Sequence, residues 1–469
     1  MTNSGAPADV YPKDEVNLDT GYGLHKGVLS PIETLAQSVS AMAPSTSPSL
    51  TIPLVFALAG NGTWFVYLLT TAAMLLVGFC ISRFARMSAS PGSLYTYTAD
   101  TLRPSLGAIG AWALLLAYVA TGASVAGGAL YYGNILLTQF FSWNPPALAT
   151  LALVFIITGA VAYRDVKLSA EMMLWVEIIS VSLIVIVLAL LLTRYGFRID
   201  MDQLKLKGVS IPHLGPALVL AMFSFVGFES ATTLGGEARE PLKTIPRAVI
   251  QCAILAGVFF MLCAYSEVLG FQGETGKLSD STSPLHVLAR KAGVSPLGTA
   301  IDFGAFVSMI SCVLACTTAA ARVLMRMARG GLLPTALERT NHAHSTPGAA
   351  IAVSSVLIFL STLALQLRGV SGAEIYDLFG SLSVFGFLTA YALVAIALPF
   401  ARRALGQHSH VVTAVSILAV IAVVLIAIFD LRSTADPVHA RIPYLYLGYI
   451  ALGIAWYFIR RKPAPPAAL

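Results

Sequence analysis

The feature that most constrains this chain is a series of long apolar runs, most of them long enough to cross a lipid bilayer. A membrane-spanning helix needs about 20 predominantly apolar residues, because lipid offers no hydrogen-bond partner to the backbone. The composition agrees, since 57% of the residues are hydrophobic and 11% are charged. The chain is therefore expected to be an all-α polytopic membrane protein.

The apolar runs divide into twelve expected spans, at residues 30–58, 64–85, 106–138, 147–163, 168–193, 211–235, 247–271, 297–323, 348–367, 374–400, 411–430 and 443–459. An even number of crossings places both termini on one side. With the termini inside, 19 of the 29 lysines and arginines flank the inner ends and 10 the outer ends. The positive-inside rule then predicts cytoplasmic termini and a location in the plasma membrane.

The tails, the cysteines and the histidines give no sign of a signal peptide or of catalysis. Residues 1–28 are polar, without the apolar stretch of a signal peptide, and are expected to be a disordered cytoplasmic tail, as is the short tail 463–469. The five cysteines lie inside apolar runs, where packing is their expected use. The eight histidines lie in loops, tails or span ends, and the chain lacks the H-E-x-x-H and G-x-S-x-G motifs. No enzymatic activity and no resident cofactor are expected.

Two spans are interrupted by residues that do not suit a continuous helix. Span 1 is broken at Ala43-Pro44-Ser45-Thr46-Ser47-Pro48, and span 6 at Gly227-Phe228-Glu229-Ser230. Because the breaks lie five spans apart, spans 1–5 and 6–10 can be related as inverted repeats. Proline kinks are common in membrane helices, but irregular backbone at membrane depth is tolerated where it lines a cavity. The paired breaks predict a binding site near the middle of the bilayer.

The break in span 1 suits an anionic group. Ser47 is expected to cap the second half of the span, with Pro48 at its first helical position. The free amides and the positive end of that half-helix would then face the cavity, together with the hydroxyl groups of Ser45, Thr46 and Ser47. Such an arrangement binds carboxylates.

The ends of the first halves of both spans suit a cation. Their last carbonyl groups, near Ala41, Ala43, Phe225 and Val226, lack helical partners and can accept hydrogen bonds from an ammonium group. A ligand with a carboxylate and an ammonium group close together is an α-amino acid. An amine without a carboxylate would use only half of this site.

Glu229 is the acidic residue within the second break. An ionised acid at the centre of a membrane helix costs about 2.5 to 3.5 kcal/mol on insertion scales, so it requires a partner, a proton or water. Three roles are open: a polar link between spans 1 and 6, a proton carrier, or a structural acid that accepts hydrogen bonds from the unwound amides of span 1.

Four motifs resemble those of the amino acid-polyamine-organocation (APC) family. They are Phe223-Ser224-Phe225-Val226-Gly227-Phe228-Glu229-Ser230 in span 6, Glu237-Ala238-Arg239-Glu240-Pro241 with Ile245-Pro246-Arg247-Ala248 after it, Pro91-Gly92-Ser93-Leu94-Tyr95-Thr96-Tyr97, and Arg322 with Met327-Ala328-Arg329-Gly330-Gly331-Leu332-Leu333-Pro334. Gly330 stands where the family usually has aspartate. The four occur in the family's order.

The resemblance implies a leucine-transporter-like fold that works by alternating access. Residues 29–400 would form ten core helices in two inverted repeats, 29–195 and 210–400, and residues 401–462 two peripheral helices. It implies a secondary active transporter of amino acids, as an ion-coupled symporter or an exchanger. The alternatives are an amine or polyamine carrier and a nutrient sensor of the same fold. A channel is disfavoured, because mixed amide and carbonyl helix ends suit an occluded zwitterion better than a file of ions.

The resemblance also assigns roles to single residues. Phe223 would close over the bound substrate from outside, with Phe225, Gly227 and Phe228 as further pocket members. Arg239 and Glu240 would belong to the cytoplasmic gate. Cys316 stands where arginine-carrying relatives have a tryptophan, and this departure favours neutral or small substrates.

The coupling ion is left open by the sequence. Proton-coupled relatives carry a span 5 lysine that occupies the place of a sodium ion, and the aligned residue here is Ser180. A sodium ion could be held by span 1 carbonyls with Ser308 and Ser311, a proton could be carried by Glu177, or transport could be simple exchange. Glu177 is equally interpreted as a hydrogen-bonded structural acid.

Overall fold

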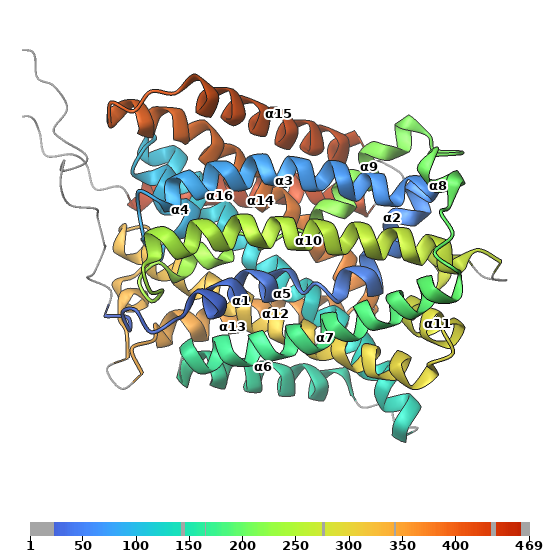
Figure 1. Cartoon of the computed structure of the whole chain (residues 1–469). Helices are drawn as coiled ribbons and strands as arrows, with labels where there is room; N and C mark the ends of the chain where they lie inside the picture. The colour runs from blue at the N-terminus through green and yellow to red at the C-terminus, as the bar shows by residue number, and fades with distance from the viewer. Residues whose placement is uncertain are drawn as a thin grey trace, which may run out of the picture.

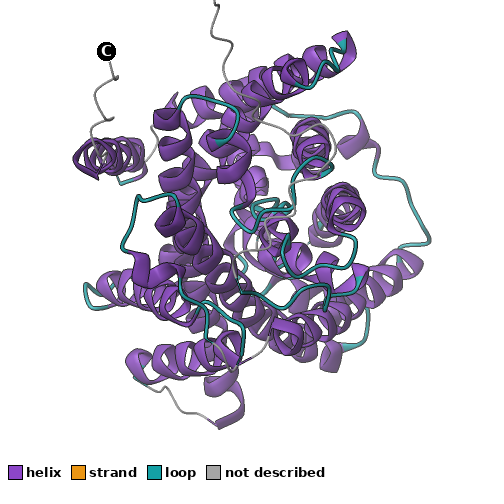
Figure 2. Cartoon of the chain, turned by 90° about the vertical axis from the view of Figure 1, so that its left-hand side faces the viewer, coloured by secondary structure: helices purple, strands orange, loops and turns teal. Residues whose placement is uncertain are grey.

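The computed structural model describes residues 23–141, 146–164, 166–273, 277–341, 344–432 and 438–460, and these residues form helices and connecting loops. The long helices run side by side as one bundle, seen lengthwise in Figure 1 and along the bundle in Figure 2. Most of the tail predicted at 1–28, and all of the tail at 463–469, lie outside the described residues.

Ten segments of the described chain are long and apolar enough to cross a membrane, and α9 (Ile211–Phe223) is a shorter apolar helix. One of the ten, Pro31–Ala85, contains several helices in succession. The main elements are α1 (Pro31–Met42), the π-helical turn η1 (Ser47–Thr51), α2 (Ile52–Ala59), α3 (Thr63–Ala85), α4 (Ser93–Ala99), α5 (Pro104–Phe141), α6 (Ala147–Arg164), α7 (Val166–Arg194), the 3-10 turn η3 (Ser230–Leu234), α10 (Pro241–Phe271), the 3-10 turn η4 (Leu278–Asp280), α11 (Pro284–Lys291), α12 (Ser295–Arg329), α13 (Gly348–Gln366), α14 (Gly372–Ala404), α15 (His410–Arg432) and α16 (Ile442–Arg460).

Helices α5, α12 and α14 are the most buried of the long helices, and α6, α13, α15 and α16 are the least buried. Helices α15 and α6 lie at opposite edges of the bundle in Figure 1. Small residues bring the central helices together, as is usual where lipid supplies no hydrophobic force between helices. A methyl group added at Gly386 of α14 would lie 2.6 Å from the Ala113 carbonyl oxygen of α5. The helices that surround the two breaks are therefore held by close backbone contact.

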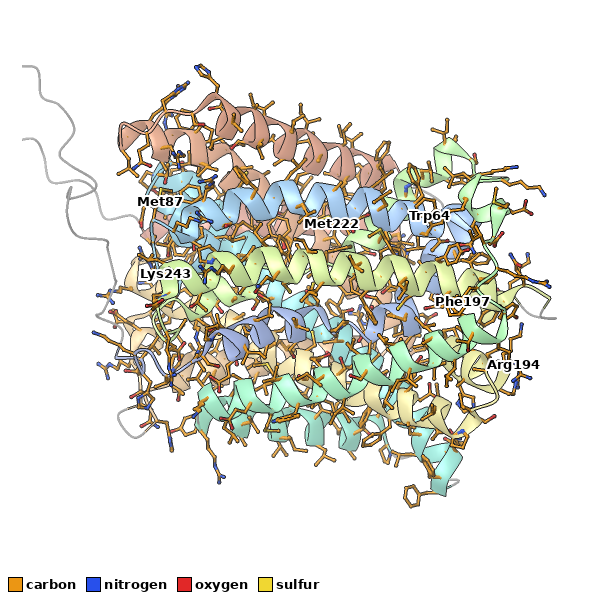
Figure 3. All side chains as sticks on the ribbon, viewed as in Figure 1. Trp64, Met87, Arg194, Phe197, Met222 and Lys243 are labelled. Carbon is orange, nitrogen blue, oxygen red and sulfur yellow. The ribbon has the colours of Figure 1, made fainter. Side chains whose placement is uncertain are left out.

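The two ends of the bundle are marked by residues that the sequence places on opposite sides of the membrane. Met87 and Lys243 lie at one end, and Trp64, Arg194 and Phe197 lie at the other (Figure 3). The sequence prediction assigns the first end to the cytoplasm. We call these the inner and outer ends.

The first span is interrupted where the sequence predicted. Helix α1 begins with a capping box between Ser30 and Glu33 and ends at Met42, after which Ala43 adopts a left-handed backbone with φ of 46°. The chain resumes as η1, which has π-helical hydrogen bonds. Pro53 has no N–H to donate to the Ser49 carbonyl, and that carbonyl accepts a hydrogen bond from the Tyr132 hydroxyl at 3.3 Å. The predicted cap at Ser47 is wrong: Thr46 precedes η1 in a helical conformation, and no side chain caps the turn.

The second break begins earlier than predicted. Helix α9 ends at Phe223, and Figure 3 places Met222, the residue before it, near the middle of the bundle's length. Ser224, Phe225 and Val226 then make successive tight turns, each N–H donating to the carbonyl three residues earlier. Gly227 follows with φ of 93°, a conformation that L-residues rarely adopt. The chain continues as η3, a single 3-10 turn.

Candidate functional site

The two breaks lie against each other. A methyl group on Gly227 would lie 2.8 Å from the Ala41 side chain and 2.9 Å from the Ala41 carbonyl oxygen. Gly227 is therefore required both for its positive φ and for this close approach. In this conformation the two helix interruptions meet at Ala41 and Gly227.

The hydroxyl groups predicted to bind a carboxylate are buried and available. The side-chain oxygens of Ser45 and Thr46 have no hydrogen-bond partner among the described residues, and both side chains are almost fully buried. Ser47 is buried as well, in the first position of η1. Buried hydroxyl groups normally find a partner, so this unpaired pair at a helix interruption is a candidate ligand site.

Three of the four carbonyl groups predicted to bind an ammonium group already take part in hydrogen bonds. The Ala41 carbonyl accepts from the Cys312 thiol at 3.1 Å, and the Ala43 carbonyl accepts from the Thr46 amide at 2.8 Å. The Phe225 carbonyl accepts from the Phe228 amide at 3.2 Å. Each carbonyl oxygen has two lone pairs, so one acceptor position remains on each.

Phe223 lies inside the bundle, at the outer side of the break. Its ring packs edge to face on Tyr376 of α14, with centroids 5.3 Å apart, and it closely approaches Gly380. The Tyr376 hydroxyl lies 2.8 Å from the Thr51 hydroxyl of η1. Phe223, Tyr376 and Thr51 thus join both broken spans to α14.

The other predicted pocket members have packing partners. Phe225 packs edge to face on Phe260 of α10, and Phe228 on Tyr391 of α14. Cys316 is buried on α12, with its sulfur 3.9 Å from that of Cys312.

Glu229 is linked to α5 and α14. The Tyr118 hydroxyl donates to its Oε1 at 2.9 Å, and the Tyr391 hydroxyl donates to its Oε2 at 2.6 Å. The predicted partners in span 1 are therefore wrong for Glu229 in this conformation. Two other residues of α1 make the contact between the broken spans: Gln37 donates to the Ser230 hydroxyl at 2.9 Å, and Ser38 accepts from the Ala231 amide at 2.8 Å.

The alternative coupling residues form one cluster between α1, α7 and α12. The Ser308 hydroxyl lies 3.0 Å from each carboxylate oxygen of Glu177. The Ser311 hydroxyl lies 2.6 Å from that of Ser40, which is a second hydrogen-bond partner of Glu177. Ser180 stands apart and donates to the Gly304 carbonyl at 3.1 Å. Ser308 and Ser311, proposed from the sequence as sodium ligands, thus lie in the same cluster as Glu177, the proposed proton carrier.

A mostly apolar groove of about 360 Å³ borders this cluster and the first break. Met42, Pro44 and Glu177 line it, together with apolar side chains of α7 and α10. The exposed side chains Ile178 and Leu255 are also part of its wall, so the groove opens on the lipid-facing side of these helices.

The inner end is closed by the chain that follows the second break. Glu237 and Arg322 of α12 form a fully buried two-point ion pair, with nitrogen–oxygen distances of 2.8 and 2.7 Å. The Arg239 amide donates to the Leu29 carbonyl, which ties this loop to the segment before α1. Glu240 is exposed and pairs with Lys243 at 3.3 Å.

Sequence reasoning missed the partners that come from distant helices. Tyr118, Tyr376 and Tyr391 lie in apolar spans, where a tyrosine gives no signal that distinguishes hydrogen bonding from packing. Glu237 and Arg322 both lie in the family motifs, but the sequence alone does not pair them. Gln37 and Ser40 could have been found from their spacing, since polar residues three apart share one face of a helix. The contact of Ser38 gives no such signal.

Interrupted apolar helices that meet at mid-depth around buried, unpaired hydroxyl groups define a membrane transporter of small molecules. The model of the amino acid permease family matches residues 45–459, and the chain belongs to this family. Its family and its named relatives are transporters and not enzymes.

Several characterised and uncharacterised transporters are similar to this chain. An uncharacterized transporter of Mycobacterium tuberculosis is 29% identical over 346 residues, which cover 71% of this chain and 73% of that protein. A branched-chain amino acid permease of Bacillus subtilis is 24% identical over 363 residues, 74% of each chain. A methylthioribose transporter of the same organism is also 24% identical, over 364 residues and 74% of each chain.

A solved structure supports the fold. The crystal structure of the Eremococcus coleocola manganese transporter matches with a TM-score of 0.57 and 12% identity, covering 92% of this chain and 94% of that one. At this identity the likeness concerns the fold alone.

Proposed function

We propose that this protein carries neutral amino acids across the plasma membrane by alternating access. The observation that carries the proposal is the pair of buried hydroxyl groups, on Ser45 and Thr46, that lack partners beside two helix interruptions in contact. They supply the carboxylate half of the site. The remaining lone pairs of the Ala41, Ala43 and Phe225 carbonyl groups, with Val226, supply the ammonium half.

The wider architecture follows from the same proposal. The chain crosses the membrane twelve times, with both termini in the cytoplasm, and spans 1–5 and 6–10 are inverted repeats. Branched-chain amino acid permeases among the relatives support a neutral substrate. Cys316, with a small side chain near the break, agrees with this class. An amine carrier is the second candidate, because it would need only the carbonyl half.

Gating uses contacts on the outer and inner sides of the two breaks. Phe223 packs on Tyr376 and closes the outer side. The buried Glu237–Arg322 pair closes the inner side, beside Arg239 and the exposed Glu240. Alternating access requires that these two sets of contacts separate in turn.

Coupling is proposed at the Glu177 cluster. A sodium ion would find hard oxygen ligands in Glu177, Ser308, Ser311 and the Ala41 carbonyl, which belong to α7, α12 and α1. A proton on Glu177 would use the same place. In either form, the bound cation stabilises the contact between α1 and the helices that flank it.

The test is uptake into proteoliposomes of a panel of labelled amino acids and amines, with sodium and pH gradients applied separately. Thr46→Val keeps the shape of the side chain and removes the hydroxyl group. It should raise the KM for amino acids about tenfold or more, because a hydrogen bond to a charged group contributes about 1.5 to 3 kcal/mol. Uptake of amines should change little.

The control is Thr158→Val, since Thr158 is buried in α6 and bonds only to carbonyl groups of its own helix. Transport of amines and of no zwitterion would show that the carboxylate half is wrong. Uptake that is indifferent to sodium at constant pH would eliminate the sodium form of the coupling.

A further inference from the structure

Glu267 of α10 is the buried glutamate without a hydrogen bond or ion pair among the described residues. Its side chain is fully buried, and neither carboxylate oxygen has a hydrogen-bond partner among the described residues. The hydroxyl group of the adjacent Ser266 also lacks a partner. Nothing in the proposed substrate site or coupling cluster uses either residue.

The other buried glutamates have what Glu267 lacks. Glu229 accepts hydrogen bonds from two tyrosines, Glu237 pairs with Arg322, and Glu177 accepts from Ser308. These donors stabilise an ionised carboxylate. A charged carboxylate without donor or counter-ion is strongly disfavoured in an apolar interior. The neutral acid is the form that fits the surroundings of Glu267.

The ionisable groups around Glu267 have other partners or stay neutral. Tyr67 of α3, Tyr132 of α5 and Cys263 of α10 are close enough to interact with its charge. The Tyr67 hydroxyl bonds to Ser224, and Tyr132 donates to the Ser49 carbonyl. Four charged residues of neighbouring elements lie towards the outer end. Lys291 of α11 donates to the Gly270 and Gln272 carbonyls, and Asp302 of α12 is bonded to Ser283 and His286. The other two are the exposed Asp280 of η4 and Arg194 of α7.

Helix α10, which carries Glu267, borders the second half of span 1, and Tyr67 near Glu267 bonds to the end of α9. Helix α10 packs against η1, the second half of span 1. Tyr67, its neighbour on α3, bonds to Ser224 at 3.0 Å, the residue that follows the end of α9. A movement of either outer half therefore changes the surroundings of Glu267.

We propose that Glu267 is a proton-binding site, which holds a proton while the outer side is closed and releases it when the outer halves separate and admit water. The proposal rests on the transport function proposed above and adds a site distinct from the Glu177 cluster. The sign follows from linkage: closing takes up a proton, so a low external pH favours closing and a high one opposes it. When closing takes up one proton, the equilibrium constant for closing falls about tenfold for each unit by which the external pH rises. This holds at pH values above the range in which an exposed carboxyl group titrates.

The first test does not depend on knowing the substrate. Dicyclohexylcarbodiimide reacts with protonated carboxyl groups in apolar surroundings: the acid proton moves to a reagent nitrogen and the carboxyl oxygen bonds to the central carbon. With the full chain in lipid vesicles, mass spectrometry should find the adduct on the peptide that contains Glu267, and Glu267→Gln should abolish it. Absence of the adduct on Glu267 from about pH 5 to about pH 8 would overturn the proposal.

The second test measures amino acid uptake against external pH, with the ion gradient across the membrane held constant. Wild-type uptake should fall as the external pH rises, and Glu267→Gln, which is neutral at every pH, should flatten this profile. The control is Glu171→Gln, since Glu171 is an exposed acid paired with Lys167. An unchanged pH profile in Glu267→Gln would overturn the proposal. In the labelling test at fixed pH, an amine that protects Glu267 from the reagent would also overturn it.

The two proposals fail in different ways. If the wild-type protein carries no amino acid but Glu267 is labelled in a pH-dependent manner, the proposed substrate is wrong and the proton site stands. If amino acids are carried and Glu267 is never labelled, the proton site is wrong and the transport function stands.

Discussion

Replacing Glu237 by glutamine tests how strongly the buried ion pair holds the inner end closed. Arg322 Nε and Nη2 lie 2.8 and 2.7 Å from the two Glu237 oxygens, and the side chains are 2% and 0% exposed. Glutamine keeps the shape but removes the negative charge and turns an NH₂ group towards the guanidinium. Breaking a buried pair in this way costs about 3 to 5 kcal/mol, because the remaining charge is left uncompensated.

The expected change in melting temperature follows from the size of the chain. An unfolding entropy of about 2.1 cal/mol/K per residue amounts to about 1 kcal/mol/K for this chain, so the melting temperature should fall by about 3 to 5 °C. The measurement is thermal unfolding of the purified protein in one detergent. Glu240→Gln is the matched control: its pair with Lys243 is 67% and 70% exposed, and it should shift the melting temperature by about 1 °C at most.

A double variant separates loss of the pair from loss of the charge balance. Replacing both Glu237 and Arg322 by methionine removes both charges and should restore part of the stability lost in Glu237→Gln. The reasoning is refuted if Glu237→Gln melts at the same temperature as Glu240→Gln.

Three further outcomes are expected. Gly227→Ala should abolish uptake, because an added methyl group would lie 2.8 Å from span 1 at a φ of 93°. The control Gly236→Ala, with its nearest contact at 3.5 Å, should transport normally. Equal uptake by the two variants would contradict this. Tyr391→Phe should lower the melting temperature, since it removes the 2.6 Å hydrogen bond to Glu229 that contributes about 1.5 to 3 kcal/mol; an unchanged value would show that this hydrogen bond does not stabilise the fold. Phe223→Ala should weaken substrate affinity in equilibrium binding, and retained affinity would exclude its role as a lid.

The spans and their interruptions could be predicted from the sequence, because they depend on local chemistry. Apolar length decides which segments enter lipid, and proline and glycine decide where a helix halts. The exact course of each break could not be predicted. The first half of span 6 ends at Phe223 and not at Gly227, and Ser47 does not cap η1, because the helical backbone already begins at Thr46. The carbonyl of Ser49 finds its partner on another helix, in Tyr132 of α5.

Sequence by itself determined that this is an all-helical membrane protein with two broken spans, and its motifs indicated the permease family. Only the tertiary structure decided which polar groups meet. Glu229 bonds to tyrosines of two other helices, Glu177 joins the serines of the coupling cluster, and Glu267 has no hydrogen-bond partner among the described residues. The physical reason is that hydrogen bonding is directional and short in range, so the partner of a buried polar group depends on how distant helices pack and is not encoded in its own segment.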